Sequence, residues 1–563
     1  MRKMIINSKY ISTDGEKYLI DYLDNNLLED FEIYAQPNLN GNRPDIVVFH
    51  KNKGVFIIEI KDWKLERFEK DYKKNKYYKY TQGNRIEIAN PNSQLKRYKE
   101  QFNYFKQVPI VCIHYFHNSY TEDIVNFLGE KGIEIFGFDK KCDLIRFILN
   151  YPNIFINCAN DIRNFISPKK HKKENGERID LTQQQKRLIE HIPNSWRRVK
   201  GVAGSGKTLI IAQKAVNIAI ANKKVLIICF NKTLKRYIKE QIGNSFKDFD
   251  WNFIEYNHFH EFIRLYVEEN ELEVKKPKYF FNDFSLYEQA LIGQVLKLQS
   301  EGLNLKNRKY DAILIDEAQD FKKEWFDILL YFLSKNNEIL LVADDKQNLY
   351  DRDVSWIKDS MNGYGYKFKG VWGVLKEAKR TNYLPNLISK VNQFFNLFLK
   401  DYLENHPDKN FGNFLNLETT TNENILDLQP LIWENINENN LYTQILYYCN
   451  HFINKKYKLK DISILVLDKN TGYNIKTFLN DNNIDIKDMF DNKEEFSLEN
   501  NNITICTINS FKGMENKVII FISEDKNNIQ NDFKTYVALT RAKEALVVLN
   551  KNKKYLEYSK EWV

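Results

Sequence analysis

Short apolar runs rich in β-branched residues alternate with longer helix-like segments from Leu181 onward. The clearest runs are KVLIICF, YDAILID, EILLVAD, DISILVL, NITICTI and KVIIFIS. Each has the length of one strand and is apolar throughout, as expected of strands that are buried on both faces. Strands of this kind are joined by crossover helices into parallel sheets. The runs are numerous enough for two such sheets, so an α/β fold is predicted.

The composition is globular and excludes several classes of protein. The 563 residues exceed what one core usually supports, so several domains are expected. Lys and Arg number 84 against 75 Asp and Glu, and the mild net charge of +9 permits a polyanionic partner without requiring one. The six cysteines form no C-x-x-C pair, which predicts reduced core thiols rather than a zinc or iron–sulfur site. Neither a membrane-spanning run nor a signal-peptide core occurs, so a cytoplasmic protein is expected.

The pattern of the chain predicts four segments. Residues 1–165 mix helix and strand patterns, and the charged stretch 166–180 has no apolar periodicity and is typical of a linker. Residues 181–375 and 376–563 are expected to form the two parallel-sheet domains. Small helical insertions are expected at about 245–305 and, reduced in size, at about 385–430.

The segment GVAGSGKT, residues 201–208, fits the pattern G-x-x-x-x-G-K-[ST] and is followed by an apolar helical stretch. Glycines allow backbone N–H groups to wrap around phosphates at the N-terminus of the helix. Lys207 is expected to bind the β- and γ-phosphates of ATP, and Thr208 to ligate Mg²⁺. The residues expected to contact the nucleotide here are Gly201, Gly204, Ser205, Gly206, Lys207 and Thr208.

The run YDAILIDEAQDF places two adjacent acids, Asp316 and Glu317, at the end of a buried strand. Asp316 is expected to hold the Mg²⁺ of the nucleotide, and Glu317 to act as general base on the attacking water. An acidic loop without this role is the alternative, but the complete phosphate-loop pattern in the same chain disfavours that alternative.

A second candidate site lies in RPDIVVFHKNKGVFIIEIKDWK, residues 43–64, where two apolar runs flank a turn centred on Asn52. In an antiparallel hairpin, residues equidistant from the centre face each other, so Asp45 and Glu59 are expected to be cross-strand partners. Lys61 shares that face. Two adjacent carboxylates repel each other unless a cation compensates, and Mg²⁺ prefers such oxygen ligands. The hairpin therefore predicts metal-dependent phosphodiester hydrolysis, with Asp45 and Glu59 as ligands and Lys61 orienting water or stabilising the phosphate.

Segments on both sides of the hairpin supply further candidates. STDGEKYLIDYLDNNL reads as a capped amphipathic helix with Glu16 in its first turn, from where Glu16 could reach the metal. ERFEKDYKKNKYYKYTQGNR mixes Lys and Tyr, which suits the backbone and bases of a nucleic acid. NPNSQLKRYKEQF begins a helix that carries Gln94, Arg97 and Tyr98.

The order of these elements resembles the PD-(D/E)xK nuclease core and, more narrowly, the nuclease-related domain called NERD, over roughly residues 10–120. The residues that carry the resemblance are Glu16, Pro44, Asp45, Glu59, Lys61 and, in an N-P-x-x-Q pattern, Asn90, Pro91 and Gln94. The resemblance implies a restriction-endonuclease-like fold and a catalytic set of Glu16, Asp45, Glu59, Lys61 and Gln94. Two alternatives stay open, a salt-bridged structural hairpin and a nuclease fold that only binds DNA.

The remaining motifs resemble, in their order, superfamily 1 helicases of the UvrD/Rep type over about 180–552. The resemblance implies two RecA-like motor domains that bind ATP between them. DLTQQQKRLIEHI is similar to the adenine-reading motif, with Gln185 as the reader. ICFNKTLKRYI is similar to a segment that grips single-stranded DNA, here with Phe230 and Asn231. VADDKQNLY is similar to the γ-phosphate sensor, with Gln347 in that role and Tyr350 near the strand.

Three more residue groups complete this resemblance. TINSFKGMENKVIIF is similar to the motif that couples ribose and DNA contacts, with Ser510 and Lys512 on DNA and Glu515 on the nucleotide. An arginine must reach the γ-phosphate from the second domain if hydrolysis is to report domain closure. The resemblance assigns that role to Arg380 in LKEAKRTNY and Arg541 in YVALTRAKEAL.

The sequence departs from the helicase pattern in three places. Asn509 stands where the family often has His, and Ala343 stands where a Gly is usual before Asp344. The stretch from Arg380 to residue 430 is too short for the large DNA-binding insertion of UvrD. This disfavours processive unwinding more than ATP hydrolysis or translocation. The resemblance favours movement from 3′ to 5′.

The combined prediction is an ATP-dependent DNA helicase or translocase with an N-terminal nuclease that uses Mg²⁺ or Mn²⁺. Its substrate is expected to be single-stranded DNA or tailed duplex, and its role to lie in DNA repair or in defence against foreign DNA. Two alternatives remain, a motor whose nuclease-like domain only binds DNA or a protein partner, and an ATP-switched DNA sensor. An RNA substrate and a homo-oligomer also stay open.

Overall fold

A computed structural model describes most of the chain, and it divides into two compact units. One unit is Met1–Lys170 with His260–Asn307, and the other is His171–Phe259 with Arg308–Val563. The first is named the nuclease unit and the second the motor unit, after the resemblances found in the sequence. The described residues are 3–562 except 7–12, 74–75, 82, 104, 106, 130–131, 168–169, 178, 180, 202–203, 271, 273–283, 301–307, 345, 348–351, 359–365, 369–371, 376–384, 410–430 and 491–501.

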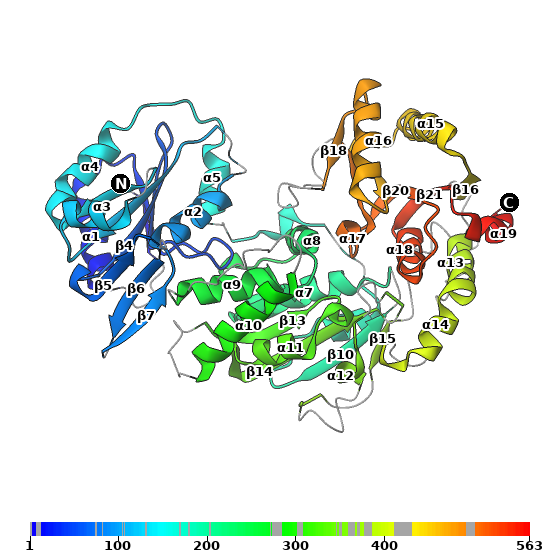
Figure 1. Ribbon diagram of the computed structural model, residues 1–563, viewed down its shortest axis with the longest axis horizontal. Helices are drawn as coiled ribbons and strands as arrows, with labels where there is room; N and C mark the ends of the chain where they lie inside the picture. Colours follow the sequence, from blue (N-terminus) through cyan, green and yellow to red (C-terminus); the bar gives the residue numbers. More distant parts are fainter. Residues whose placement is uncertain are drawn as a thin grey trace. The chain divides into compact units, whose positions relative to one another are not determined.

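The nuclease unit is built on a six-stranded mixed sheet (Figure 1). Only the pairings β2–β3 and β3–β4 are antiparallel, and the other neighbouring strands run parallel. The strands, in their order across the sheet, are β1 (Lys3–Ile6), β2 (Glu32–Ala35), β3 (Ile46–His50), β4 (Gly54–Lys61), β8 (Ile110–Phe116) and β9 (Glu134–Gly137).

Helices cover both faces of this sheet and bury its apolar strands. On one face, Leu19 of α1 (Asp14–Asn26) and Leu144 of α4 (Lys141–Asn150) pack with Ile58 of β4. On the other face, the core includes side chains of α2 (Pro91–Gln101) and α5 (Ala159–Ile166) packed with Val55 and Ile57 of β4. Both faces being buried explains why β3 is apolar from Ile46 to Phe49 and β4 from Val55 to Ile58, before the polar residues of β4 begin at Glu59. A further helix, α3 (Thr121–Leu128), follows β8.

A small antiparallel sheet and two helices complete the nuclease unit. The sheet comprises β5 (Phe68–Asp71), β6 (Lys76–Thr81) and β7 (Asn84–Ile88), which follow the hairpin in sequence. The side chains of Tyr77 and Ile88 in this sheet are buried in a cluster with Trp63 and Phe116. The helices are α9 (Phe259–Glu269) and α10 (Phe284–Ser300), which fall in the range where the first helical insertion is expected.

The motor unit contains two six-stranded sheets, and every strand pairing in them is parallel. The first, in spatial order, is β12 (Ile254–His258), β11 (Val225–Cys229), β13 (Tyr310–Ile315), β14 (Leu333–Ala343), β10 (Trp196–Gly201) and β15 (Gly373–Leu375). The second is β16 (Leu431–Asn435), β21 (Ala542–Asn550), β20 (Asn516–Ser523), β17 (Ile462–Val466), β19 (Ile503–Thr507) and β18 (Ile486–Asp488).

All six apolar runs singled out in the sequence are strands of these two sheets, so the predicted α/β class is confirmed. The helices of the first domain are α6 (Gln183–Leu188), α7 (Lys207–Ile220), α8 (Lys232–Gly243), α11 (Lys323–Leu330) and α12 (Ser355–Lys358). Those after residue 384 are α13 (Pro385–Phe398), α14 (Lys400–Asn405), α15 (Leu441–Asn454), α16 (Lys469–Asp481), α17 (Ile508–Phe511), α18 (Ile529–Leu539) and α19 (Leu556–Ser559). Among the described helices, none is both long and apolar enough to cross a membrane.

The charged stretch expected to be a linker is docked where it is described. The backbone of His171 exchanges hydrogen bonds of 2.8 and 3.2 Å with that of Phe249, and its ring lies 2.8 Å from the Ser245 carbonyl oxygen. Glu177 also bridges to Ser245. In its described residues this stretch therefore forms short bridges to the segment around Ser245 and Phe249.

Candidate functional sites

The hairpin has the register that its sequence predicts. His50 pairs with Gly54 and Ile46 pairs with Ile58 across β3 and β4, which centres the turn on Asn52. One step further places Asp45 opposite Glu59. The Oδ2 atom of Asp45 accepts a hydrogen bond of 2.7 Å from the N–H of Ile60, which fixes this carboxylate against β4.

Lys61 joins the hairpin to helix α2. Its ammonium group donates to Glu59 Oε1 at 3.0 Å and to Gln94 Oε1 at 3.3 Å. The amide of Gln94 donates to the Tyr98 hydroxyl at 2.7 Å, and that hydroxyl donates to the Arg43 carbonyl at 3.1 Å. Burial raises the pKa of Tyr98 well above its ordinary value, so the phenol keeps the proton that it donates. The structure thus brings Glu59, Lys61 and Gln94 together and adds Tyr98.

The carboxylates of this site suit a divalent cation. Asp45 is 7 % exposed and Glu59 is 3 % exposed, and Glu59 Oε2 is a buried oxygen without a hydrogen-bond partner among the described atoms. Buried anionic oxygens of this kind cost free energy unless a cation or donor compensates. Among the described residues, no group of three or more His, Cys, Asp or Glu side chains is arranged to hold a metal. Two carboxylates completed by water and substrate oxygens match the preference of Mg²⁺.

Glu16 reaches this region indirectly. Thr13 caps α1 by accepting a bond from the Glu16 N–H, and the buried Glu16 carboxylate accepts a bond of 2.5 Å from the Gln36 side chain. The backbone N–H of Gln36 donates to the Asp45 carbonyl at 2.8 Å. Gln36 has a φ of +46°, an uncommon conformation for a residue with a side chain. Gln36 is therefore a link between Glu16 and Asp45 that the sequence pattern does not reveal.

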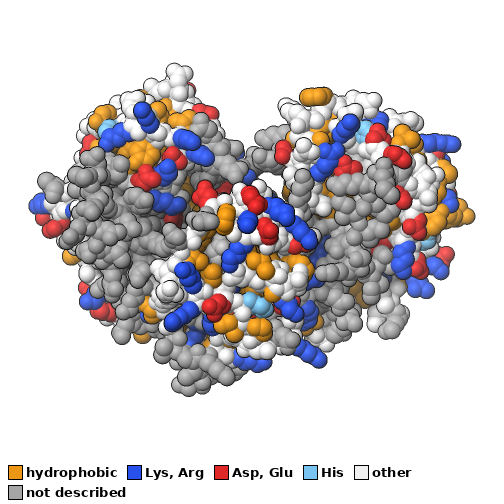
Figure 2. All heavy atoms as spheres, turned by 180° about the vertical axis from the view of Figure 1, so that it is seen from behind, with side chains coloured by type: hydrophobic (Ala, Val, Ile, Leu, Met, Phe, Trp, Pro, Cys, Tyr) orange, Lys and Arg blue, Asp and Glu red, His pale blue; other side chains and the backbone are white. Residues whose placement is uncertain are grey.

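The Lys- and Tyr-rich stretch pairs much of its own charge. Arg85 binds Glu69 at 2.6 Å and stacks on Tyr78 at 3.6 Å, and Lys76 binds Glu87 at 2.9 Å. These residues lie on one face of the β5–β7 sheet because their positions alternate with the buried Tyr77 and Ile88. Basic and acidic side chains are likewise interspersed on the face of the molecule in Figure 2. Charge on this stretch therefore supports a nucleic-acid contact less than its sequence suggests.

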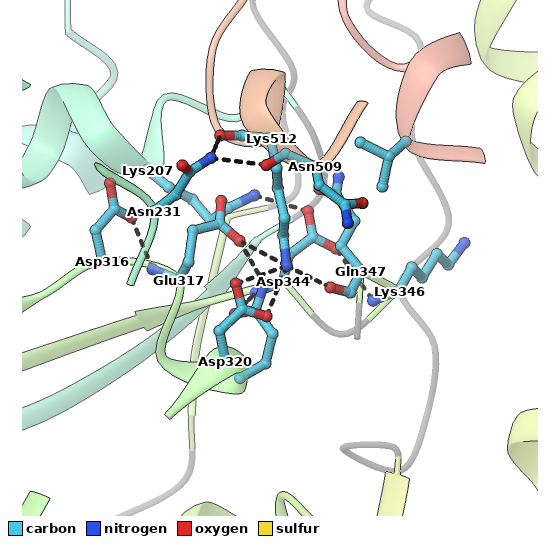
Figure 3. Close-up of polar contacts among 12 residues, drawn as sticks. Lys207, Asn231, Asp316, Glu317, Asp320, Asp344, Lys346, Gln347, Asn509 and Lys512 are labelled. Carbon is cyan, nitrogen blue, oxygen red and sulfur yellow. Dashed lines mark hydrogen bonds and ion pairs between the residues drawn. The ribbon is translucent and has the colours of Figure 1, made fainter. Parts of the chain in front are cut away.

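The phosphate loop of the motor unit leads into α7 as expected. Gly204 and Gly206 have positive φ angles of 83° and 80°, and α7 begins at Lys207. The Lys207 ammonium group donates to the Gly201 carbonyl at 2.8 Å and to Asp344 Oδ2 at 2.9 Å (Figure 3). A carboxylate from the end of β14 therefore neutralises the lysine that is expected to bind phosphates.

The side chain of Gln185 hydrogen-bonds to the backbone of the phosphate loop. Its side-chain oxygen accepts from the Thr182 N–H at 3.0 Å in a capping box, and its side-chain nitrogen donates to the Ser205 carbonyl at 3.0 Å. Gly206 has a φ of +80°, which favours glycine, and a Cβ atom there would also lie 2.9 Å from that nitrogen. Both polar atoms of Gln185 are engaged in this way, and its role as adenine reader stays a prediction.

The first of the two acids after β13 contacts helix α7, which follows the phosphate loop. The Thr208 hydroxyl donates to Asp316 Oδ2 at 2.8 Å. Burial, together with the neighbouring charge of Glu317, raises the pKa of Asp316 to about 7. Glu317 has a φ of +54°, which turns the chain sharply at this point. A hydroxyl beside a buried carboxylate is a donor set that suits Mg²⁺, and the cation would restore the charge that burial disfavours.

Residues from the domain of the second sheet contact the domain of the first sheet beside these acids. The Lys512 ammonium group donates to both carboxylate oxygens of Asp320 at 2.7 and 2.8 Å and to the Gln347 carbonyl at 2.7 Å (Figure 3). The Arg541 guanidinium donates to Gln347 Oε1 at 2.9 Å. Lys512 and Asp320 are each 1 % exposed. Lys512, expected on DNA, thus binds an acid of the D-E-A-Q-D motif.

A second set of contacts joins the same two domains. The Asn231 side-chain amide donates to the carbonyls of Asn509, Ser510 and Lys512 at 3.0, 3.2 and 3.1 Å. Thr233 also binds the Ser510 carbonyl. The segment expected to grip single-stranded DNA therefore contacts the turn around α17, and its role on DNA stays a prediction.

The remaining predicted residues are scattered around these contacts. The half-buried Phe230 stacks on Trp325 at 5.5 Å, and the Ser510 hydroxyl lies 3.0 Å from that of Thr507. The Oε2 atom of Glu515 lies 3.9 Å from the ammonium nitrogen of Lys543. Arg380 and Tyr350 lie outside the described residues. The sequence did not single out Asp320 or Asp344 for a role, although both lie inside the motifs that it identifies.

Comparison with known families agrees with this geometry. Residues 11–117 match the nuclease-related domain family, and this range contains α1, the hairpin and α2. Residues 184–352 match an AAA domain, and this range contains the phosphate loop, the two acids and Gln347. No curated protein matches the chain. The two matches agree with the expected order of an N-terminal nuclease-related (NERD) domain followed by a helicase-like ATPase domain.

Proposed function

We propose that the protein is an ATP-driven translocase on single-stranded or tailed DNA whose N-terminal domain hydrolyses DNA with Mg²⁺ or Mn²⁺. The observation that carries the motor part is the convergence of Lys512 and Arg541, from the domain of the second sheet, on Gln347 of the domain of the first. Gln347 lies three residues after Asp344, which pairs with Lys207 of the phosphate loop. These contacts link the lysine of the phosphate loop to the second domain, which supports a coupling of nucleotide to domain position as a stepping motor requires.

The connection runs through Lys207. A bound γ-phosphate competes with Asp344 for the Lys207 ammonium group, so ATP binding releases Asp344 and the chain that leads to Gln347. Arg541 is then available to follow Gln347 towards the phosphate. The oxygen of the attacking water bonds to the γ-phosphorus and its proton passes to Glu317, while the bond from the γ-phosphorus to the bridging oxygen breaks and ADP leaves. Loss of phosphate restores the Lys207–Asp344 pair.

The nuclease part uses the hairpin and α2. A divalent cation held by Asp45 and Glu59 would polarise the scissile phosphate and supply a nucleophilic water at neutral pH. Lys61, fixed by Glu59 and Gln94, neutralises charge on the phosphate as the water oxygen bonds to phosphorus and the P–O bond of the leaving strand breaks. Tyr98 fixes both Gln94 and the Arg43 carbonyl, two residues before Asp45.

A second candidate function, an ATP-switched DNA sensor, is favoured by one observation. Asn231 and Lys512, both expected on DNA, bind the opposite domain of the motor unit. A DNA strand that uses them must break these bonds, so strand binding opposes domain contact. Such competition is sufficient for a switch and does not require unwinding.

ATPase and strand-displacement assays separate these functions. We expect single-stranded DNA to stimulate ATP hydrolysis more than RNA does, and Lys207→Ala to abolish hydrolysis. Displacement of a strand from tailed duplex under ATP supports the translocase, and stimulation without any displacement or translocation supports the sensor. Equal stimulation by RNA would contradict the DNA assignment. A nuclease joined to such a motor suits a role in DNA repair or in defence against foreign DNA.

A further inference from the structure

One helix of the protein belongs to both compact units. Helix α9 follows β12 of the first motor sheet, and its first residue, Phe259, belongs to the motor unit. The rest of α9, from His260, belongs to the nuclease unit, and the chain returns to the motor sheet at β13. The motor and nuclease units therefore share a continuous secondary-structure element.

The first residue of α9 packs behind the acidic motif of the ATP site. Phe259 is fully buried, with its ring 4.8 Å from that of Trp325 and 6.0 Å from that of Phe321. Phe321 directly follows Asp320, the acid that binds Lys512. Because protein interiors are close-packed, a rearrangement of this motif is transmitted to Phe259.

The last turn of α9 carries Glu268, which forms an ion pair with Arg97 of α2. Arg97 is 3 % exposed, and its Nε donates a hydrogen bond of 3.1 Å to Asn42 Oδ1. A guanidinium this deeply buried requires an acidic partner, since removal of that partner leaves an uncompensated charge. Glu268 is therefore the counter-ion that keeps Arg97 bound to Asn42.

Asn42 belongs to the turn that delivers Asp45 to the hairpin. The backbones of Leu39 and Asn42 exchange hydrogen bonds of 2.8 and 3.2 Å, and Asn42 is 2 % exposed. The next residue, Arg43, is fixed through its carbonyl by Tyr98. Arg97 and Tyr98 are adjacent in α2. They thus bind Asn42 and Arg43, which closely precede the candidate metal ligand Asp45 in the chain.

We propose that Arg97 is a positioning residue of the nuclease site and that Glu268 makes this site respond to the ATP site through α9. The proposal rests on the proposed function and adds a direction to it, from nucleotide to nuclease. Movement of α9 changes the Glu268–Arg97 pair, and the change reaches Asp45 through Asn42. Neither residue touches the substrate, so both act by placing Asp45.

The test compares the full-length wild type with Glu268→Gln and Arg97→Lys, with and without Mg²⁺ and a non-hydrolysable ATP analogue. Hydrogen exchange of the backbone over residues 38–45 reports the turn, and cleavage of labelled single-stranded DNA reports the site. ATP hydrolysis reports the motor. Glu100→Gln is the matched control, because Glu100 is an exposed carboxylate on the same helix as Arg97.

We expect the analogue to change exchange over residues 38–45 of the wild type about fivefold, a typical coupling between two sites. In Glu268→Gln and Arg97→Lys, exchange there should be faster and no longer respond to the analogue. Cleavage by both variants should fall about tenfold, as for other residues that orient metal ligands. ATP hydrolysis should stay at the wild-type rate, and Glu100→Gln should match the wild type throughout.

Exchange over residues 38–45 that ignores the analogue in the wild type would overturn the proposal, as would an unchanged response in Glu268→Gln. Loss of ATP hydrolysis together with cleavage in Glu268→Gln would show a purely structural role and would also overturn it. A wild type that cuts no DNA but shows the Glu268-dependent response retains the coupling, and in that case only the proposed nuclease activity fails.

Discussion

The ammonium group of Lys207 lies 2.9 Å from a carboxylate oxygen of Asp344, and both side chains are buried. Lys207 is the residue expected to bind ATP phosphates, so this ion pair and ATP compete for one cation. Asp344 is also tied to the following chain, because its Oδ1 accepts from the Lys346 N–H at 3.1 Å. The pair therefore connects the phosphate loop with the position of Gln347.

Asp344→Asn should destabilise the protein in the absence of nucleotide and should increase the stabilisation that ATP binding provides. Removal of one partner of a buried ion pair costs about 3–5 kcal/mol, because a charge is left uncompensated. Bound ATP supplies that charge, so the ATP-induced rise in unfolding temperature should be larger in the variant than in the wild type. Thermal unfolding with and without Mg²⁺–ATP measures both quantities. An equal ATP-induced rise would show that Asp344 does not compete with phosphate.

Tyr98→Phe should lower DNA cleavage by about tenfold, as expected when a residue that orients the site is lost. The substitution removes the hydroxyl that joins Gln94 to the Arg43 carbonyl and leaves that carbonyl without this donor. The stability cost should be about 1–3 kcal/mol. Tyr80→Phe is the control, since it removes a hydroxyl that binds Glu69 on the exposed face of the β5–β7 sheet. Equal cleavage by the two variants would argue against the role of Tyr98.

Asp45→Asn should abolish Mn²⁺ binding at the nuclease site, whereas Glu16→Gln should weaken it by about tenfold. Asp45 is a candidate ligand, but Glu16 contacts the site through Gln36, and partners of ligands typically change affinity about 10–100-fold. Titration of Mn²⁺ followed by electron paramagnetic resonance, in the Lys207→Ala background without nucleotide, isolates this site. Loss of binding in both variants would make Glu16 a direct ligand.

Stability of the motor unit should fall as pH rises from about 4 to about 7 through Asp320. Burial raises the pKa of Asp320 to about 7 from an ordinary value of 3.8, despite the opposing effect of Lys512. Between these two values, the folded protein binds a proton at Asp320 that the unfolded chain does not, so the free energy of unfolding declines with pH. Urea unfolding of wild type and Asp320→Asn from pH 5 to 8 checks this. Parallel pH profiles would contradict it.

Local patterns in the sequence predicted the elements that depend on short-range geometry. The six apolar runs became parallel strands because burial on both faces requires apolar residues throughout. The opposition of Asp45 and Glu59 followed from counting outward from Asn52, since antiparallel register is set by the turn. The glycines of the phosphate loop likewise adopt the positive φ angles that their pattern implies.

Partners from distant parts of the chain could not be predicted in this way. Asp320 and Lys512 are 192 residues apart, and nothing in either motif specifies that one neutralises the other. The pairing of Arg97 with Glu268 depends on where α9 packs, which periodicity does not encode. The partner of Gln185 could not be predicted either, although it lies nearby in sequence. Its amide can hydrogen-bond to an adenine base or to the backbone of the phosphate loop, and only packing decides between them.

The central claim is that the chain holds two separable sites, and cutting of a labelled DNA with a single-stranded tail tests it most directly. Wild type, Lys61→Ala and Lys207→Ala are compared in Mg²⁺ or Mn²⁺, with and without ATP. We expect Lys61→Ala to lose cutting and keep DNA-stimulated ATP hydrolysis, and Lys207→Ala to lose ATP hydrolysis and keep cutting in the absence of ATP. A wild type that hydrolyses ATP with DNA but cuts nothing in either metal would contradict the claim and reduce the hairpin to a binding surface.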